Sequence, residues 1–217
     1  VGSTLRGNIG SEIRAVLDES GRRAVVCSAL PREGRTVVDG IGLLDSVPLH
    51  LTEYALDPTV PCRESSLLTI LRNAGVDVSS MPLSVVRAGK DILAQRIIAC
   101  TCEAVVVDAW TGDDMRIIGH TIAALGSGWC ACASSGLSPH LAEALGRHRV
   151  MARSQLCRPG DTGILAVIGT TNPVSAAQVR ELDRLDDVVV IQVEAIALCA
   201  GSPETAGWKE EAVRALE

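Results

Sequence analysis

The first residues of the chain have side chains and spacing that suit the binding of a small anion. The segment 2–10 reads Gly-Ser-Thr-Leu-Arg-Gly-Asn-Ile-Gly and directly precedes an amphipathic stretch. Free amides at a helix N-terminus favour a carboxylate or phosphate, and Arg6 can add two parallel hydrogen bonds. The alternative from local chemistry is a capped helix in which Arg6 pairs with a structural carboxylate. The residue types alone favour neither interpretation over the other.

A second polar group lies between residues 34 and 58. Arg35, His50, Thr52, Glu53 and Asp57 fall in a stretch with little helical or strand periodicity. Polar residues on an irregular excursion are more typical of a binding loop than of packing. His50 by itself is a candidate base or a plain hydrogen-bonding residue of the loop.

A third segment, Gly169-Thr170-Thr171-Asn172, follows an apolar run and precedes a helical pattern. Asn172 suits the helix cap and Pro173 the first helical position. A strand, a polar turn and a helix N-terminus can together cradle a phosphate. The segment matches neither the P-loop nor the dinucleotide-binding glycine pattern.

Two smaller polar groups follow predicted strands, at residues 108–114 and 134–137. Open α/β sheets bind ligands at the carboxyl ends of their strands, so both are candidate contacts. The alternatives are a helix cap at Thr111 or an aspartate, and an ordinary tight turn at 134–137.

The elements that must position these residues alternate between short apolar runs and amphipathic stretches, which is typical of parallel strands joined by helices. Helices are expected before Gly21 and Gly75, and Asp39-Gly40 indicates an antiparallel hairpin. We therefore predict an α/β fold: a Rossmann-like parallel sheet flanked by helices, with an antiparallel hairpin excursion, followed by the start of a second α/β domain. The expected strands are 24–28, 83–87, 104–109, 129–133, 163–168 and 188–193.

Periodicity is lost between residues 151 and 162, where Pro159-Gly160 precedes a new apolar run. This break divides the chain into two predicted domains, 1–155 and 156–217. The chain begins with Val1, within the anion-binding segment, so we expect the natural protein to start further upstream.

Composition excludes several classes of function. The net charge of -6 comes without a basic stripe, and one Tyr, three Trp and no Phe cannot build a stacking platform, so we expect no nucleic-acid partner. Without a long apolar span or a signal pattern, we expect a cytoplasmic protein and no membrane partner. The eight cysteines lie mostly in apolar runs and lack Cys-x-x-Cys spacing. They indicate reduced core thiols and no metal site.

Several segments together resemble the four-carbon acid sugar kinase family in order and spacing. They are Ser3 to Gly10, Gly34 to Gly40, Val47 to Pro58, Val106 to Ala109, Ser134 to Leu137 and Gly169 to Val174. Gly2 stands where the family has Lys or Asp, and 169–172 departs from its Gly-Ser-Cys-Ser turn. The family's N-terminal Asp-Asp segment and C-terminal glycine-rich loops have no counterpart among these residues.

The resemblance implies an ATP-dependent kinase that phosphorylates a hydroxyl of threonate, erythronate or an oxo-tetronate, with Mg²⁺ as cofactor. It implies a sugar-acid substrate domain over 1–155 and the beginning of a nucleotide domain over 156–217. A homodimer is a candidate assembly, and the catalytic base is expected upstream of Val1. The implied substrate-binding residues are Ser3, Thr4, Arg6, Gly7, Asn8, Arg35, His50, Thr52 and Glu53. The implied nucleotide-binding residues are Gly169, Thr170, Thr171 and Asn172.

Two other functions stay open. The altered turn and the missing segments also fit a non-catalytic sugar-acid-binding module or a degenerate kinase. An NAD-dependent oxidoreductase is disfavoured because the glycine fingerprint is absent. As a fragment, the chain is not expected to complete a catalytic cycle.

Overall fold

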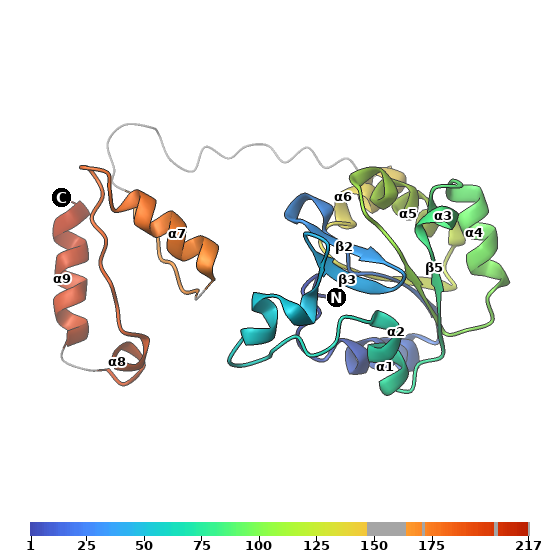
Figure 1. The fold of residues 1–217 in the computed structure, drawn as a ribbon, viewed down its shortest axis with the longest axis horizontal. Helices are drawn as coiled ribbons and strands as arrows, with labels where there is room; N and C mark the ends of the chain where they lie inside the picture. Colours follow the sequence, from blue (N-terminus) through green and yellow to red (C-terminus); the bar gives the residue numbers. More distant parts are fainter. Residues whose placement is uncertain (147–163, 171, 202–203, 217) are drawn as a thin grey trace. The chain divides into compact units, whose positions relative to one another are not determined.

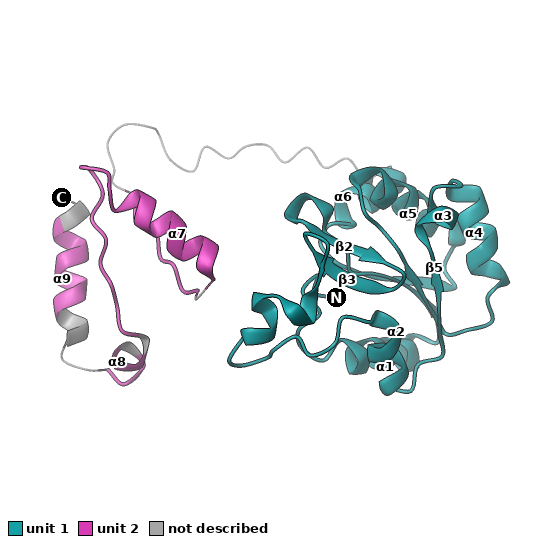
Figure 2. Ribbon diagram, in the orientation of Figure 1, with its two compact units in different colours: residues 1–150 teal, residues 151–217 magenta. Residues whose placement is uncertain are grey.

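The computed structural model describes residues 1–146, 164–170, 172–201 and 204–216. The chain divides into two compact units, Val1–Val150 and Met151–Glu217 (Figure 2). The residues 151–162, on which the predicted domain boundary falls, lie outside the described part, as do Cys157 and Thr171.

The first unit is built on a four-stranded parallel sheet in the order β5-β6-β1-β7. The helices α1 and α2 pack together on one side of it, and α3 to α6 form the other layer (Figure 1). The predicted α/β architecture is confirmed. The strands of this sheet are β1 (Arg23–Cys27), β5 (Val78–Met81), β6 (Ala104–Val107) and β7 (Trp129–Ala133). The helices are α1 (Ile9–Ser20), α2 (Leu67–Asn73), α3 (Leu83–Val86), α4 (Lys90–Ala99), α5 (Gly112–Leu125) and α6 (Ser138–Ala144).

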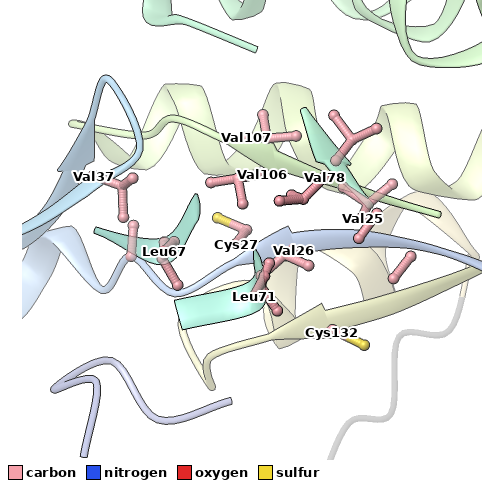
Figure 3. Packing of buried hydrophobic residues seen from close by; sticks show 14 of the residues in the cluster. Val25, Val26, Cys27, Val37, Leu67, Leu71, Val78, Val106, Val107 and Cys132 are labelled. Carbon is pink, nitrogen blue, oxygen red and sulfur yellow. The ribbon is translucent and has the colours of Figure 1, made fainter. Parts of the chain in front are cut away.

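The two central strands, β1 after Arg23 and β6, are apolar runs because helices cover both of their faces. Val25, Val26, Val105 and Val106 are fully buried, at 0% exposure. Figure 3 shows Val25, Val26 and Val106 packed with Leu71 of α2 and with Cys27 in one cluster. The core therefore lies along β1 and β6, and the polar segments that follow the strands project from its carboxyl edge.

An antiparallel hairpin leaves the main sheet after β1, as the Asp39-Gly40 pair predicts. It consists of β2 (Arg35–Val38), β3 (Ile41–Leu44) and the short β4 (Val47–Pro48). Asp39 and Gly40 both have positive φ, of 51° and 73°, as the tight hairpin turn requires. The buried carboxylate of Asp108, just after β6, accepts hydrogen bonds from the amides of Asp39 (2.7 Å) and Gly40 (3.0 Å). The hairpin is thereby fixed to the carboxyl end of the parallel sheet.

Both expected helices of the first half are confirmed. The helix α1 ends at Gly21, which has the left-handed φ of 61°, and α2 ends just before Gly75, with a φ of 74°. Thr111 caps α5 and shares a capping box with Asp114, as the structural alternative for that segment predicts.

One predicted strand of the first unit is wrong. Residues 83–87 form α3 and its C-cap, and the strand lies upstream, in β5. Pro82 lacks an amide hydrogen and suits the residue just before a helix. As an edge strand, β5 pairs with one neighbour only and carries two half-buried serines between Val78 and Met81, so it has no apolar run to reveal it.

The second unit contains, in its described residues, the helices α7 (Pro173–Leu182), α8 (Ala195–Cys199) and α9 (Glu204–Leu216). The predicted strand at 188–193 is wrong, and residues 164–168 of the other predicted strand also lie outside any strand. A parallel strand needs a neighbour for its backbone groups, and the described residues of this unit provide none. Ile164 and Val167 are accordingly 94% and 88% exposed.

Candidate functional site

The anion-binding segment predicted at residues 2–10 forms a loop that leads into α1. Leu5 has a φ of 51°, in the left-handed region that a non-glycine residue rarely adopts. Its side chain is buried at 5% exposure and lies close against Gly42 of β3. Strained backbone of this kind persists where the surrounding packing fixes it and is frequent at ligand sites. The loop that carries Arg6 is therefore held against the hairpin by Leu5.

Three groups hold the guanidinium of Arg6. Its Nε donates a hydrogen bond to Thr4 Oγ1 (3.1 Å), and its Nη1 forms an ion pair with the carboxylate of Asp57. Its Cζ lies 5.4 Å from the centroid of the Tyr54 ring. Among the described residues, Nη2 makes no hydrogen bond, and the side chain is 37% exposed. One edge of the guanidinium thus stays available to a ligand.

Asp57 is itself fixed by the turn that follows it. Its Oδ1 accepts hydrogen bonds from the amides of Thr59 (3.0 Å) and Val60 (2.9 Å). These amides, with the neighbouring Arg6 guanidinium, hold the pKa of Asp57 below its usual range. Asp57 is therefore a lasting negative partner for Arg6 at neutral pH.

These residues line an open cavity of about 400 Å³. Thr4, Arg6 and Gly7 of the first loop form part of its wall, together with Asp57, Thr59 and Val60. The volume lies in the range of small-molecule sites. The arrangement offers a cation, two threonines and backbone groups to a small polar ligand.

The N-terminus of α1 adds unpaired donors to the same loop. Asn8 occupies the cap position, but its side chain makes no capping hydrogen bond. The amides of Ile9, Gly10 and Ser11 consequently have no acceptor within the described part of the chain. Unpaired first-turn amides favour negative charge through the helix dipole.

The other predicted substrate-binding residues do not line this cavity. His50 pairs through Nδ1 with Ser65 Oγ (2.7 Å), and Thr52 donates to the carbonyl of Leu49 (2.7 Å). Arg35 donates to the Tyr54 hydroxyl (2.9 Å). Ser3 and Glu53 lie outside the lining as well. The structure thus brings together Thr4, Arg6 and Gly7 of the predicted set.

Sequence reasoning gave no role to Tyr54, Thr59 or Val60. The Asp57-Pro58 pair carries a turn signal, since an aspartate before proline commonly accepts from amides two and three residues on. No local sequence signal places Tyr54 at the site, because the two arginines that it contacts are distant from it in the sequence.

The described residues of the predicted nucleotide-binding turn at 169–172 make two local hydrogen bonds around Asn172. The Asn172 amide donates to Thr170 Oγ1 (3.2 Å), and Asn172 Oδ1 accepts from the Val174 amide (2.8 Å). Pro173 has no amide hydrogen, so in the first turn of α7 only the Ser175 amide is left without an acceptor among the described residues. The role of residues 169–172 in nucleotide binding stays a prediction, and no step of phosphoryl transfer is assigned to them.

The part of the chain that the structure describes holds no group of three or more His, Cys, Asp or Glu side chains that could bind a metal ion. Its described cysteines are free, and Cys27, Cys62, Cys102 and Cys132 are buried, as expected for core thiols. None of its helices has the length and apolar character needed to cross a membrane.

The fold is an α/β domain, and the residues that line its cavity suit a small polar ligand. The family described as Sugar-binding N-terminal domain matches residues 1–141. The chain therefore belongs to this family, and the predicted resemblance to the four-carbon acid sugar kinases is confirmed.

The relatives include enzymes with named substrates. The D-erythronate kinase of Heliobacterium modesticaldum is 36% identical over 55% of this chain and 29% of its own length. The D-threonate kinase of Bordetella bronchiseptica is 33% identical over 85% of this chain and 42% of its own length. The chain thus spans less than half of these curated relatives.

A solved structure has the same fold. It is a domain of unknown function from Bordetella bronchiseptica, crystallised with bound citrate as a domain-swapped dimer. It matches 70% of this chain and 37% of its own, with a TM-score of 0.60 and 33% identity.

Proposed function

We propose that this chain carries the acid-binding domain of an ATP-dependent kinase that phosphorylates a hydroxyl of a four-carbon sugar acid. The observation that carries the proposal is the Arg6 guanidinium, held by Thr4 and Asp57 at a cavity of about 400 Å³ with one nitrogen unpaired. Threonate and erythronate, the acids that the relatives' names give, each carry one carboxylate. A carboxylate is the natural partner of that nitrogen and of the α1 amides.

The role of the described residues is to bind and orient the acid. Arg6 and the first-turn amides would hold the carboxylate, and the hydroxyls of Thr4 and Thr59 would contact the hydroxyls of the sugar acid. Asp57 and Thr4 already occupy Nη1 and Nε of Arg6, so a bidentate clamp would require one of them to give way. Nη2 alone allows one charge-assisted bond without any rearrangement.

We further propose residues 1–155 as the substrate domain and 156–217 as the beginning of the nucleotide domain. The family match over residues 1–141 and the division into units at Val150 support this assignment. Mg-ATP would supply the transferred phosphoryl group to the whole protein. A homodimer is proposed because a relative of the same fold crystallised as a domain-swapped dimer, and light scattering of the purified protein tests it.

Calorimetry tests the proposal directly. The 217-residue chain is titrated with D-threonate and with D-erythronate, with and without a non-hydrolysable ATP analogue. Binding of an acid supports the acid-binding role. In the protein extended on both sides, binding of acid together with the ATP analogue supports the kinase, whereas acid binding alone favours a non-catalytic sugar-acid-binding module. No binding of either acid would overturn the proposal.

A further inference from the structure

Tyr54 lies between two arginines that the sequence singles out separately. It belongs to the short 3-10 helix Glu53–Leu56 and is 9% exposed. The Arg6 guanidinium lies over its ring at 5.4 Å, and its hydroxyl accepts a hydrogen bond from Arg35 Nη1 (2.9 Å). It is also the only tyrosine of the chain. One side chain therefore contacts both arginines.

The contact with Arg6 restricts the plane of its guanidinium. The bonds to Thr4 and Asp57 fix two of the three nitrogens, but each allows the group to pivot. An aromatic face attracts the flat side of a guanidinium and so limits that pivot. A side chain ordered in this way before a ligand arrives loses less entropy when the ligand binds.

The contact with Arg35 fixes the ring in turn. Arg35 is half-buried, does not line the cavity, and leaves its buried Nε without an acceptor among the described residues. The hydrogen bonds of Arg35 therefore do not by themselves explain why its side chain is half-buried. The backbone of Tyr54 is also held, since its carbonyl accepts from the Cys62 amide (2.8 Å) and its amide donates to Thr52 Oγ1 (3.4 Å).

We infer that Tyr54 is a positioning residue, which holds the Arg6 guanidinium in the orientation that binds the acid and is itself held by Arg35. The ligand part of this inference rests on the proposed function. Arg35 then acts through Tyr54 and not by touching the acid. Asp57 balances one of the two positive charges, so the cluster carries a net charge of about +1 and suits a single carboxylate.

The first experiment needs no ligand. ¹⁵N relaxation of the arginine Nε–Hε groups is measured in the 217-residue chain and in Tyr54→Leu, Tyr54→Phe and the control Leu56→Ala, which alters an 81% exposed residue of the same 3-10 helix. We expect Arg6 Nε to become more mobile in Tyr54→Leu, less so in Tyr54→Phe, and not in the control. The Nε signal of Arg14, which is held by Asp18 and Glu103, should not change in any variant. If Arg6 keeps its wild-type rigidity in Tyr54→Leu, the inference is wrong.

The second experiment measures the dissociation constant for D-threonate. Tyr54→Leu should weaken binding about fivefold, as expected for loss of a partly desolvated cation–π contact, and Tyr54→Phe by a smaller factor. In an Arg6→Ala background, Tyr54→Leu should cause no further loss, because its effect passes through Arg6. Equal losses in both backgrounds would show a purely structural role and overturn the inference. If the wild-type chain binds no D-threonate, the proposed function fails, whereas the relaxation experiment still decides whether Tyr54 orders Arg6.

Discussion

Truncation of Asp108 should loosen the hairpin that supports the site. Asp108 is fully buried at 0% exposure and accepts hydrogen bonds from the Asp39 and Gly40 amides. In Asp108→Ala the buried Gly40 amide loses a charge-assisted hydrogen bond, which costs about 1.5–3 kcal/mol of stability. The amide of the exposed Asp39 can form a hydrogen bond with water instead, so its loss costs only about 0.5–1 kcal/mol. Burial raises the pKa of Asp108, which means that the ionised carboxylate is itself disfavoured by desolvation. Removing it relieves this desolvation penalty and so offsets part of the lost stability. We expect a net loss of about 2 kcal/mol of unfolding free energy.

Urea denaturation of the 217-residue chain at pH 7 measures this loss. Asp108→Asn keeps an acceptor for the turn and should lose less, and Asp113→Ala, an 83% exposed aspartate nearby, should be neutral. Because the folded-state pKa of Asp108 is raised, the stability that its protonation contributes is complete below the unfolded value and is lost as the pH rises through the folded value. Asp108→Asn should lack this dependence. The reasoning is refuted if Asp108→Ala unfolds at the wild-type urea concentration.

Three further changes test the packing and electrostatics. Gly10→Ala should lower the free energy of unfolding by about 1–3 kcal/mol, because the added Cβ would lie 2.7 Å from a backbone carbonyl oxygen of α2. The control Gly2→Ala, where the added Cβ would have no atom of the described residues within 4 Å, should leave the urea unfolding curve unchanged. Burial would raise the pKa of Asp114, but hydrogen bonds from a guanidinium and from backbone amides lower the pKa overall. The ionised carboxylate therefore contributes stability at neutral pH, and this contribution is lost as the pH falls through the folded-state pKa. Asp114→Asn should accordingly weaken the fall in stability at acid pH. Burial raises the pKa of Cys132 to about 12, so iodoacetamide at pH 8 should modify the exposed Cys199 and spare Cys132 until the chain unfolds, as mass spectrometry of the peptides would show. Rapid modification of native Cys132 would contradict its burial.

The central part of the fold could be predicted because its sequence signals are local. The strands β1 and β6 are covered on both faces, and apart from Arg23 at the start of β1 they consist of valine, alanine and cysteine. The hairpin follows from Asp39-Gly40, since few residue pairs tolerate two successive positive φ angles. In these segments the residue types themselves indicate burial and the turn.

The elements that were mispredicted depend on neighbours that the local sequence does not show. The edge strand β5 has an interrupted pattern because two half-buried serines lie between Val78 and Met81. The run 188–193 has the composition of a buried strand, yet Val189 is 59% exposed and pairs with no strand in the described residues. An apolar run predicts that a segment can be buried in a sheet, not that the sheet is present.

The candidate site was predictable only in part, for a similar reason. The residue types around Arg6 indicate an anion site, but its pairing with Asp57 joins residues 51 positions apart. Of the local alternative, a capped helix with Arg6 paired to a carboxylate, the described part of the structure has the ion pair but no side-chain cap at Asn8, and the ion pair leaves Nη2 unpaired there. Contacts at such separations are fixed by the fold, and neither the role of Tyr54 nor the position of Arg35 behind it could be derived from spacing.

The most direct test is the affinity of the chain for D-threonate with and without the Arg6 guanidinium. Calorimetry compares the wild type with Arg6→Ala and with Arg22→Ala, which removes an exposed arginine beyond the far end of α1. Loss of a charge-assisted bond of about 1.5–3 kcal/mol predicts binding about 10- to 100-fold weaker in Arg6→Ala and unchanged in Arg22→Ala. Equal affinity of the wild type and Arg6→Ala would contradict the assignment of this cavity as the acid-binding site.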